Sequence, residues 1–156
     1  MTERSTTHAA FSLERIYDAS PARVFAAWAS AEAKARWFNG GEEWTPIERV
    51  LDFRIGAREH VSGAWRGGTV SRFDARYHDI VANERIVYAY DMHLDDRHIS
   101  VSLATVTFKP AGAGTRLILT EQGVFLDGYD DAGARERGTG GLLDRLGAAL
   151  KRRDHG

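Results

Sequence analysis

The sequence contains no cysteine, and it has few lysines and no long apolar run. Without cysteine the chain cannot form disulfides, thiolate metal sites or a cysteine nucleophile, and it suits a reducing compartment. No window approaches the roughly 20 apolar residues of a membrane-spanning helix. The opening residues MTERSTTHAA lack the apolar core of a signal peptide. These absences predict a cytoplasmic protein without a membrane span.

The charges are balanced: 21 Lys and Arg stand against 22 Asp and Glu, and the formal net charge is -1. A chain without a basic excess creates no long-range field that favours nucleic acid or an anionic membrane, so neither partner is expected. The basic run at residues 151–153 ends the last predicted helix. There, positive side chains interact favourably with the helix dipole.

A chain of 156 residues with 43% hydrophobic content fits one globular domain. We expect residues 1–8 to form a flexible tail and residues 9–153 to fold as a single domain. No internal repeat, linker or low-complexity segment interrupts that range.

Apolar and polar residues alternate along much of the chain, which predicts a sheet of seven strands. Ser20 followed by Pro21, and then Ser30, are typical helix N-caps, so two short helices should follow the first strand. The predicted strands cover residues 9–18, 47–55, 57–62, 69–81, 86–92, 99–109 and 115–124.

The last segment, Asp131 to Arg153, predicts a long helix whose second half carries leucines at the spacing of one apolar face. Its first half contains Gly138, Gly140 and Gly141. Each glycine costs about 1 kcal/mol relative to alanine inside a helix. The sequence therefore predicts either a bend or interruption at these glycines or a close approach by another group.

An antiparallel sheet needs its apolar face covered, and the terminal helix is the only predicted element long enough to cover it. We therefore expect an α+β fold in which a curved sheet wraps around the C-terminal helix, with the two short helices capping the space between them. Small molecules usually bind in concave apolar spaces of this kind.

Glu121 is the polar residue that this arrangement singles out. It alternates with Leu117 and Leu119, so either its carboxylate points into the cavity or the strand twists near residues 122–123 and leaves it in water. An inward carboxylate needs a partner, and burial would raise its pKa and suit it to orient a ligand or act as a general acid or base. The candidate partners are His60, Arg72, Tyr88 and Tyr90, and alternation along the strand at residues 86–92 places both tyrosines on one face.

Several aromatic residues near loops suit either core packing or the apolar mouth of a pocket with a mobile lid. Among them, Trp44 follows a glycine-rich loop and is expected to be exposed. The residues of this group are Trp37, Phe38, Trp44 and Trp65.

The sequence shows no established catalytic or metal-binding motif. On a hairpin, side chains such as those of His93 and His98 with Asp95 and Asp96 diverge, so we expect a solvated turn there and no metal site. The glycines at residues 138–141 do not form a phosphate loop, because no Gly-Lys-Ser/Thr follows them, and no Gly-x-Ser-x-Gly elbow occurs. No cofactor is predicted.

Short segments, in order along nearly the whole chain, resemble the activator-of-heat-shock-protein-ATPase homologues. These proteins are a branch of the START-related (SRPBCC) helix-grip superfamily. The segments are Phe11–Arg15, Ser20–Trp28, Trp37–Phe38, Asp52–Arg58, Asn83–Tyr88, Gly114–Leu117 and Gly141–Leu146.

The resemblance implies a helix-grip (START or Bet v-type) fold with a hydrophobic cavity. It also implies relatives that bind lipids or polyketides, some that catalyse cyclisation and some that assist a chaperone. The family commonly has tryptophan after the glycine that precedes the helix leucines, whereas this chain has Thr139 after Gly138. The exchange removes bulk from the helix side of the cavity.

Three functions are compatible with these observations. The first is non-catalytic binding of a small hydrophobic or aromatic ligand, lipid- or polyketide-like, between the sheet and the helix. The second is an enzyme of cyclase, dehydratase or hydrolase type with Glu121 as acid or base, and the third is a module that activates a chaperone ATPase. A homodimer is also left open. The expected ligand-binding residues are Trp37, Phe38, Trp65, Tyr88, Tyr90, Phe108, Glu121, Phe125, Gly138, Thr139 and Leu142.

Overall fold

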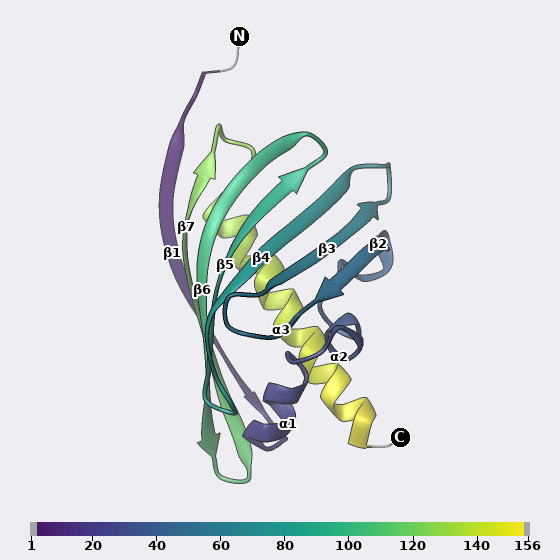
Figure 1. Ribbon diagram of the computed structural model, residues 1–156, viewed down its shortest axis with the longest axis vertical. Helices are drawn as coiled ribbons and strands as arrows, with labels where there is room; N and C mark the ends of the chain where they lie inside the picture. The colour runs from purple at the N-terminus through teal and green to yellow at the C-terminus, as the bar shows by residue number, and fades with distance from the viewer. Residues whose placement is uncertain (1–2, 155–156) are drawn as a thin grey trace.

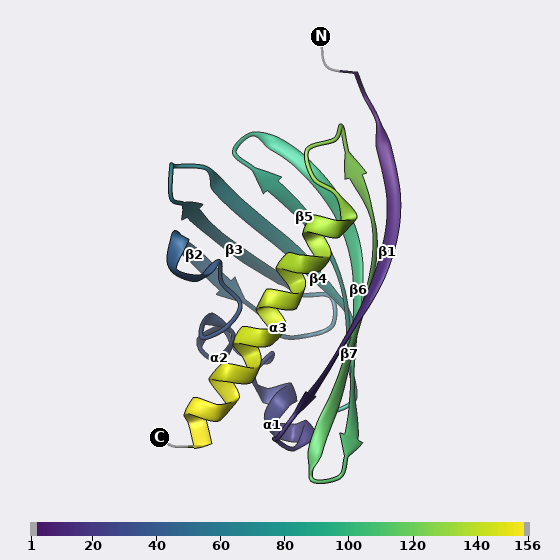
Figure 2. The same ribbon diagram turned by 180° about the vertical axis from the view of Figure 1, so that it is seen from behind.

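The computed structural model describes residues 3–154, which form a curved antiparallel sheet of seven strands and a long helix across its concave face (Figure 1). The view from behind shows α3 in front of the sheet, with α1 and α2 beside the half of α3 that leads to the C-terminus (Figure 2). The strand order is β1-β7-β6-β5-β4-β3-β2. The predicted α+β helix-grip fold is confirmed.

After the short helices, six strands follow one another through turns, and the chain ends in the long helix. The strands are β1 (Thr6–Tyr17), β2 (Trp44–Leu51), β3 (Arg58–Trp65), β4 (Val70–Val81), β5 (Arg85–Leu94), β6 (Arg97–Ala111) and β7 (Gly114–Leu126). The helices are α1 (Pro21–Ala26), α2 (Ala31–Ala35), the 3-10 turn η1 (Gly41–Glu43) and α3 (Ala132–Asp154).

The first strand begins earlier than predicted. Residues Thr6–His8, which the sequence places in the flexible tail, pair with Val124–Leu126 of β7. The Asp127 carboxylate accepts a hydrogen bond from the Ser5 amide, which holds this end of the strand. Side chains 6–8 are exposed, so no apolar alternation marked the strand in the sequence. Met1 and Thr2, the start of the predicted tail, lie outside the described residues.

The two predicted N-caps are confirmed. The Ser20 side chain accepts a hydrogen bond from the Arg23 amide at 3.3 Å, and the Ser30 side chain accepts one from the Ala33 amide at 3.1 Å. These caps satisfy amide groups that a helix start otherwise leaves without partners. They fix the two short helices that close one end of the space under the sheet.

Helix α3 is continuous from Ala132 to Asp154, so the predicted interruption at residues 138–141 does not occur. The Asp131 side chain caps it by accepting a hydrogen bond from the Ala134 amide at 2.8 Å. A Cβ added at Gly138 would meet no atom within 4 Å, so no group approaches the backbone there.

The other reason predicted for glycines in this helix is a close approach by another group. Such an approach occurs where α3 crosses β1. A Cβ added at Gly140 would lie 3.2 Å from Arg15 Nη2, and one at Gly147 would lie 3.2 Å from the Tyr17 ring. The Tyr17 hydroxyl donates a hydrogen bond to the carbonyl oxygen of Leu143 at 2.7 Å. The small helix residues therefore let the side chains of β1 reach the helix backbone.

Candidate ligand-binding cavity

A cavity of about 460 Å³ lies between the concave face of the sheet and α3. Its walls come from β3, β4, β5, β7 and one side of α3, and the loop before η1 forms its rim. The apolar residues that line it are Trp28, Phe38, Trp44, Val61, Trp65, Phe73, Tyr88, Tyr90, Met92, Leu119, Leu142 and Leu143. Its polar lining includes Asn39, Ser71, Glu121, Asp130, Arg135, Arg137, Thr139 and Arg145.

The sheet side of the cavity is a continuous aromatic wall. Tyr88 and Tyr90 alternate onto the same face of β5, as predicted, and their ring centroids are 6.0 Å apart. Phe73 of β4 lies 4.8 Å from the Tyr90 ring, and Phe38 from the end of α2 meets Phe73 edge-on at 4.9 Å. The side-chain period of two along each strand, combined with the strand register, brings these rings together.

Trp44 is buried, in contrast to the exposed position that the sequence predicts. Its indole lies against Gly63 of β3 and against Gly40, and a Cβ at either glycine would overlap it. Its Nε1 donates a hydrogen bond to the Ser71 hydroxyl at 3.0 Å. Two glycines that are distant in the sequence thus leave a slot for the indole, which becomes part of the cavity wall.

Glu121 points into the cavity from β7, which settles the choice between the two predicted orientations. Its residue is only 3% exposed, on the same face as Leu117 and Leu119. The Tyr90 hydroxyl donates to the carboxylate and lies 2.9 Å from each of its oxygens. Burial raises the pKa of Glu121, and the nearby Arg135 guanidinium and the Tyr90 hydrogen bond oppose that rise.

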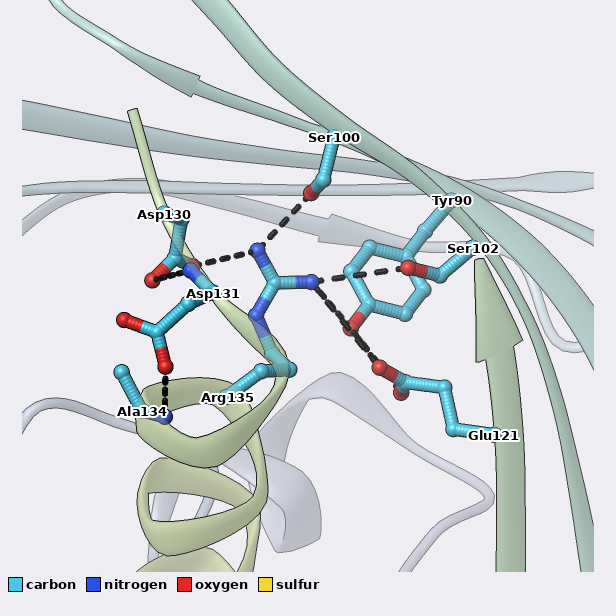
Figure 3. A network of polar contacts seen from close by, with 8 residues as sticks. All are labelled: Tyr90, Ser100, Ser102, Glu121, Asp130, Asp131, Ala134 and Arg135. Carbon is cyan, nitrogen blue, oxygen red and sulfur yellow. Dashed lines mark hydrogen bonds and ion pairs between the residues drawn. The ribbon is translucent and has the colours of Figure 1, made fainter. Parts of the chain in front are cut away.

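Arg135, in the first turn of α3, completes this polar cluster (Figure 3). Its Nη1 donates to the Tyr90 hydroxyl oxygen at 2.9 Å and lies 3.9 Å from Glu121 Oε2. Its Nη2 donates to the Ser100 hydroxyl at 2.8 Å and to Asp130 Oδ2 at 2.9 Å. The guanidinium therefore stands between two carboxylates at the inner end of the cavity.

The sequence interpretation missed Arg135, although a signal was present. Arg135 precedes Thr139 by four residues and Leu142 by seven, and this is the spacing of one helix face. A cation on the helix face that packs against a sheet needs a buried partner. That requirement would have paired Arg135 with Glu121.

A second buried polar cluster lies behind the aromatic wall. Lys34 Nζ donates to Glu59 Oε1 at 2.7 Å, and the Tyr77 hydroxyl donates to the same oxygen at 2.7 Å. Burial lowers the pKa of Lys34, and the attraction of Glu59 opposes this change. The Phe38 ring centroid lies 4.3 Å from the ammonium. The cluster joins α2 to β3 and β4, and so holds Phe38 at the cavity.

Eight of the eleven predicted ligand-binding residues line the cavity. They come from five separate parts of the chain, which the sheet and α3 bring together. They are Phe38, Trp65, Tyr88, Tyr90, Glu121, Gly138, Thr139 and Leu142.

The other three predicted residues pack elsewhere, and the structure corrects their placement. Trp37 lies edge-on against Trp28, with ring centroids 4.6 Å apart, and its indole is buried in the core. Phe108 packs against the aromatic residues of α1 and the segment after it. Phe125 lies 5.3 Å from the guanidinium of Arg135 and supports it from below the cavity.

Two of the predicted partners for the buried carboxylate face away from it. His60 and Arg72 alternate with Val61 and Phe73, whose side chains face the cavity. His60 Nδ1 pairs instead with Asp74 at 2.6 Å. Strand alternation, which correctly placed the tyrosines, excludes both residues from the interior.

The polar hairpin between β5 and β6 is held by local contacts. The His93 and His98 rings stack with centroids 4.5 Å apart, and His98 Nε2 lies 3.1 Å from Asp91. Asp95 accepts a hydrogen bond from the Val70 amide at 2.9 Å. Among the side chains that the structure describes, those of residues 3–152, no three from His, Asp or Glu gather in a way that could hold a metal ion. In that same range no helix is both long and apolar enough to cross a membrane.

Arg145 ties the rim loop to α3. Its Nε donates to the carbonyl oxygen of Trp37 at 3.3 Å, and its Nη2 donates to that of Asn39. Burial lowers the pKa of Arg145. Two hydrogen bonds to backbone carbonyls therefore hold the rim loop against α3.

The similarities to known proteins agree with the fold. The family model described as activator of Hsp90 ATPase homolog 1-like protein matches residues 18–151. A protein of Rhizobium leguminosarum with a solved structure is 48% identical, with a TM-score of 0.92 over 97% of this chain and 99% of that one. The Mll3558 protein of Rhizobium loti is 44% identical, with a TM-score of 0.85 over 93% and 99%.

A solution structure of an AHSA1-like protein from Aeromonas hydrophila is 19% identical, with a TM-score of 0.71 over 94% of each chain, and this likeness concerns the fold alone. No curated protein matches the chain. The family match covers most of the sequence, and the nearly full-length similarities support it. The chain therefore belongs to the activator of Hsp90 ATPase homolog 1-like family, within the START-related helix-grip superfamily.

Proposed function

We propose that the protein binds a small hydrophobic or aromatic molecule, lipid- or polyketide-like, in the cavity between the sheet and α3. The observation that carries this proposal is the cavity itself. Its volume of about 460 Å³ falls within the range of about 300 to 1,000 Å³ that is typical of ligand pockets. Aromatic and aliphatic side chains form most of its walls, and its polar groups include the cluster of Glu121 and Arg135 and, at the rim, Asn39 and Arg145.

The small residues of α3 support the same function. Thr139 is buried and lines the cavity, and Gly138 lines it where the helix surface is exposed, so neither residue fills the space with a large side chain. Unfilled apolar volume destabilises a fold, because the lining side chains lose van der Waals contacts. A ligand that fills the volume restores those contacts. Because it binds only the folded state, its binding also stabilises the protein against unfolding.

A substitution on the cavity wall tests this proposal. Thr139→Trp places an indole in the cavity and should weaken binding of the neutral fluorescent probe 1-pyrenemethanol by about tenfold or more. Ala148→Trp adds the same ring on the exposed side of α3 and should leave the affinity unchanged. Equal affinities for both variants and the wild type would place the probe outside the cavity. If neither the probe nor a panel of lipids and polyketides binds saturably, the proposal is wrong.

The pair of Glu121 and Tyr90 supports a second candidate function, acid or base catalysis on a bound ligand of cyclase, dehydratase or hydrolase type. Burial raises the pKa of the Glu121 carboxyl, and this is the direction that suits a carboxyl to act as a general acid. Under this proposal Glu121→Gln abolishes turnover of a bound substrate and leaves its affinity within a few fold. Unchanged turnover in this variant would remove Glu121 from any catalytic role.

A further inference from the structure

The Glu121 carboxylate has hydrogen-bond capacity that the protein does not use. An ionised carboxylate offers about four acceptor positions. Among the described residues, one hydrogen reaches it, the hydroxyl proton of Tyr90, which the two oxygens share. Arg135 Nη1 lies 3.9 Å from Oε2, which is too far for a hydrogen bond. A buried carboxylate is costly unless it is paired, so this group can accept a further donor from the cavity that it lines.

The charges around Glu121 favour a positive donor. Among the described residues, Arg135 is the one cation within 4 Å of Glu121, and its Nη2 is already paired with Asp130 at 2.9 Å. Arg137 and Arg145 also line the cavity, and Arg145 is held at the rim by the carbonyl oxygens of Trp37 and Asn39. Two carboxylates therefore share one guanidinium, and ionisation of both leaves one surplus negative charge at the inner end of the cavity. Attraction between opposite charges is strong where water is excluded, so a cationic ligand group gains more there than in solvent.

Arg135 is poorly placed to hold an anionic ligand. Its Nη1 donates to Tyr90, with the Ser102 hydroxyl at 3.5 Å, and its Nη2 donates to Ser100 and Asp130. A ligand carboxylate would have to displace one of these partners (Figure 3). It would also add a third negative charge beside Glu121.

The aromatic wall adds a second attraction for a cation. The faces of tyrosine and phenylalanine rings attract ammonium groups within about 6 Å. The Tyr88 and Tyr90 rings lie side by side on this wall, next to the carboxylate. The protein's own cations also contact them, because Lys34 Nζ lies 5.7 Å from the Tyr88 ring and the Arg135 guanidinium lies 5.7 Å from the Tyr90 ring. Within the described part of the chain, the Tyr88 hydroxyl makes no hydrogen bond, and burial raises its pKa, so it stays neutral. This hydroxyl is a second group that a ligand can use.

We propose that the preferred ligand carries a protonated amine on its apolar or aromatic body, and that the Glu121 carboxylate holds this amine beside the Tyr88 and Tyr90 rings. The inference rests on the proposed function, because it names the ligand class of the same cavity. The apolar body then occupies the space toward Thr139 and Leu142 of α3.

Three probes with one ring system separate the head group from the body: 1-pyrenemethylamine, 1-pyrenemethanol and 1-pyrenecarboxylate. Fluorescence titration at neutral pH should show that the wild type binds the amine about tenfold or more tighter than the carboxylate. Glu121→Gln keeps the size of the side chain and an acceptor for Tyr90, and it should abolish that preference, while measurable binding of the alcohol shows that the cavity is intact. Glu136→Gln removes an exposed carboxylate from the neighbouring residue of α3 and should keep the preference.

The possible results distinguish this inference from the proposed function. If the carboxylate binds as tightly as the amine or tighter, the inference is overturned. Loss of that carboxylate binding in Arg145→Gln would then place the head group at the rim. If the alcohol binds and the amine has no advantage, the inference fails and the proposed function stands. If none of the three probes binds, the proposed function fails as well. The wild-type comparison alone decides the matter if Glu121→Gln does not fold.

Discussion

Removing one partner of the buried pair Lys34–Glu59 leaves the other charge stranded inside the protein. Both side chains are at most 1% exposed. In the variant Lys34→Met, Glu59 keeps the hydrogen bond from the Tyr77 hydroxyl but loses its cation. Its Oε2 already has no hydrogen-bond partner among the described residues. Breaking a buried ion pair in this way costs about 3 to 5 kcal/mol.

The expected loss is large enough to measure by ordinary unfolding experiments. For a chain of this length, 1 kcal/mol corresponds to a shift in Tm of about 2 to 4 °C, so Lys34→Met should lower Tm by about 10 °C. Urea unfolding at neutral pH, followed by tryptophan fluorescence and circular dichroism, gives the free energy of unfolding directly. Part of the loss comes from the contact between the ammonium and the Phe38 ring.

Two further variants make the interpretation specific. The double variant Lys34→Met, Glu59→Gln removes the stranded charge and keeps an acceptor for Tyr77, so it should recover at least half of the lost stability. Arg36→Met breaks the exposed pair with Glu32 in the same short helix and should change the free energy of unfolding by about 0.5 kcal/mol or less. A loss below about 1 kcal/mol for Lys34→Met, or a double variant no more stable than the single one, would refute this reasoning.

Three more outcomes follow from the cavity and its walls. Gly138→Ala should stabilise the protein by about 1 kcal/mol in urea unfolding, because the added Cβ meets no atom within 4 Å and alanine favours helix. Gly63→Ala should displace the indole of Trp44, change its fluorescence and cost about 1 to 3 kcal/mol. Burial raises the pKa of Glu121 above 4.5, so the stability that this carboxyl contributes is fully present below pH 4.5 and is lost as pH rises through the folded-state pKa. As pH rises from 4.5 through the folded-state pKa, the Tm of Glu121→Gln should therefore increase relative to the Tm of the wild type.

Local patterns in the sequence predicted most of the fold. Alternation located all seven strands, and the serines at residues 20 and 30 located the starts of both short helices, because each signal depends on residues close in the chain. The start of β1 was missed, since the side chains of Thr6–His8 are exposed and carry no apolar pattern. Only the pairing with β7, which is distant in sequence, makes that segment a strand.

The cavity was predicted where strand alternation decides which side chains face inward. Tyr88, Tyr90 and Glu121 were identified in this way, and all three line the cavity. Trp44 and Lys34 depend on contacts between distant segments. Trp44 needs a slot that glycines elsewhere leave open, and Lys34 needs Glu59 of another strand. A pattern within one element carries no information about such partners.

The glycines of α3 show how one sequence feature can have two physical causes. Gly140 and Gly147 face β1: a Cβ at Gly140 would lie 3.2 Å from the flexible end of Arg15, and one at Gly147 would lie 3.2 Å from the Tyr17 ring, so a side chain at Gly147 requires that ring to shift. Gly138 has no such neighbour and lines the cavity. A larger residue at Gly147 should therefore impair the packing of α3 on β1, whereas a larger residue at Gly138 should chiefly alter which ligands the cavity accepts. Helix propensity assigns the same cost to each glycine, and the neighbouring atoms separate a structural role from a ligand-binding one.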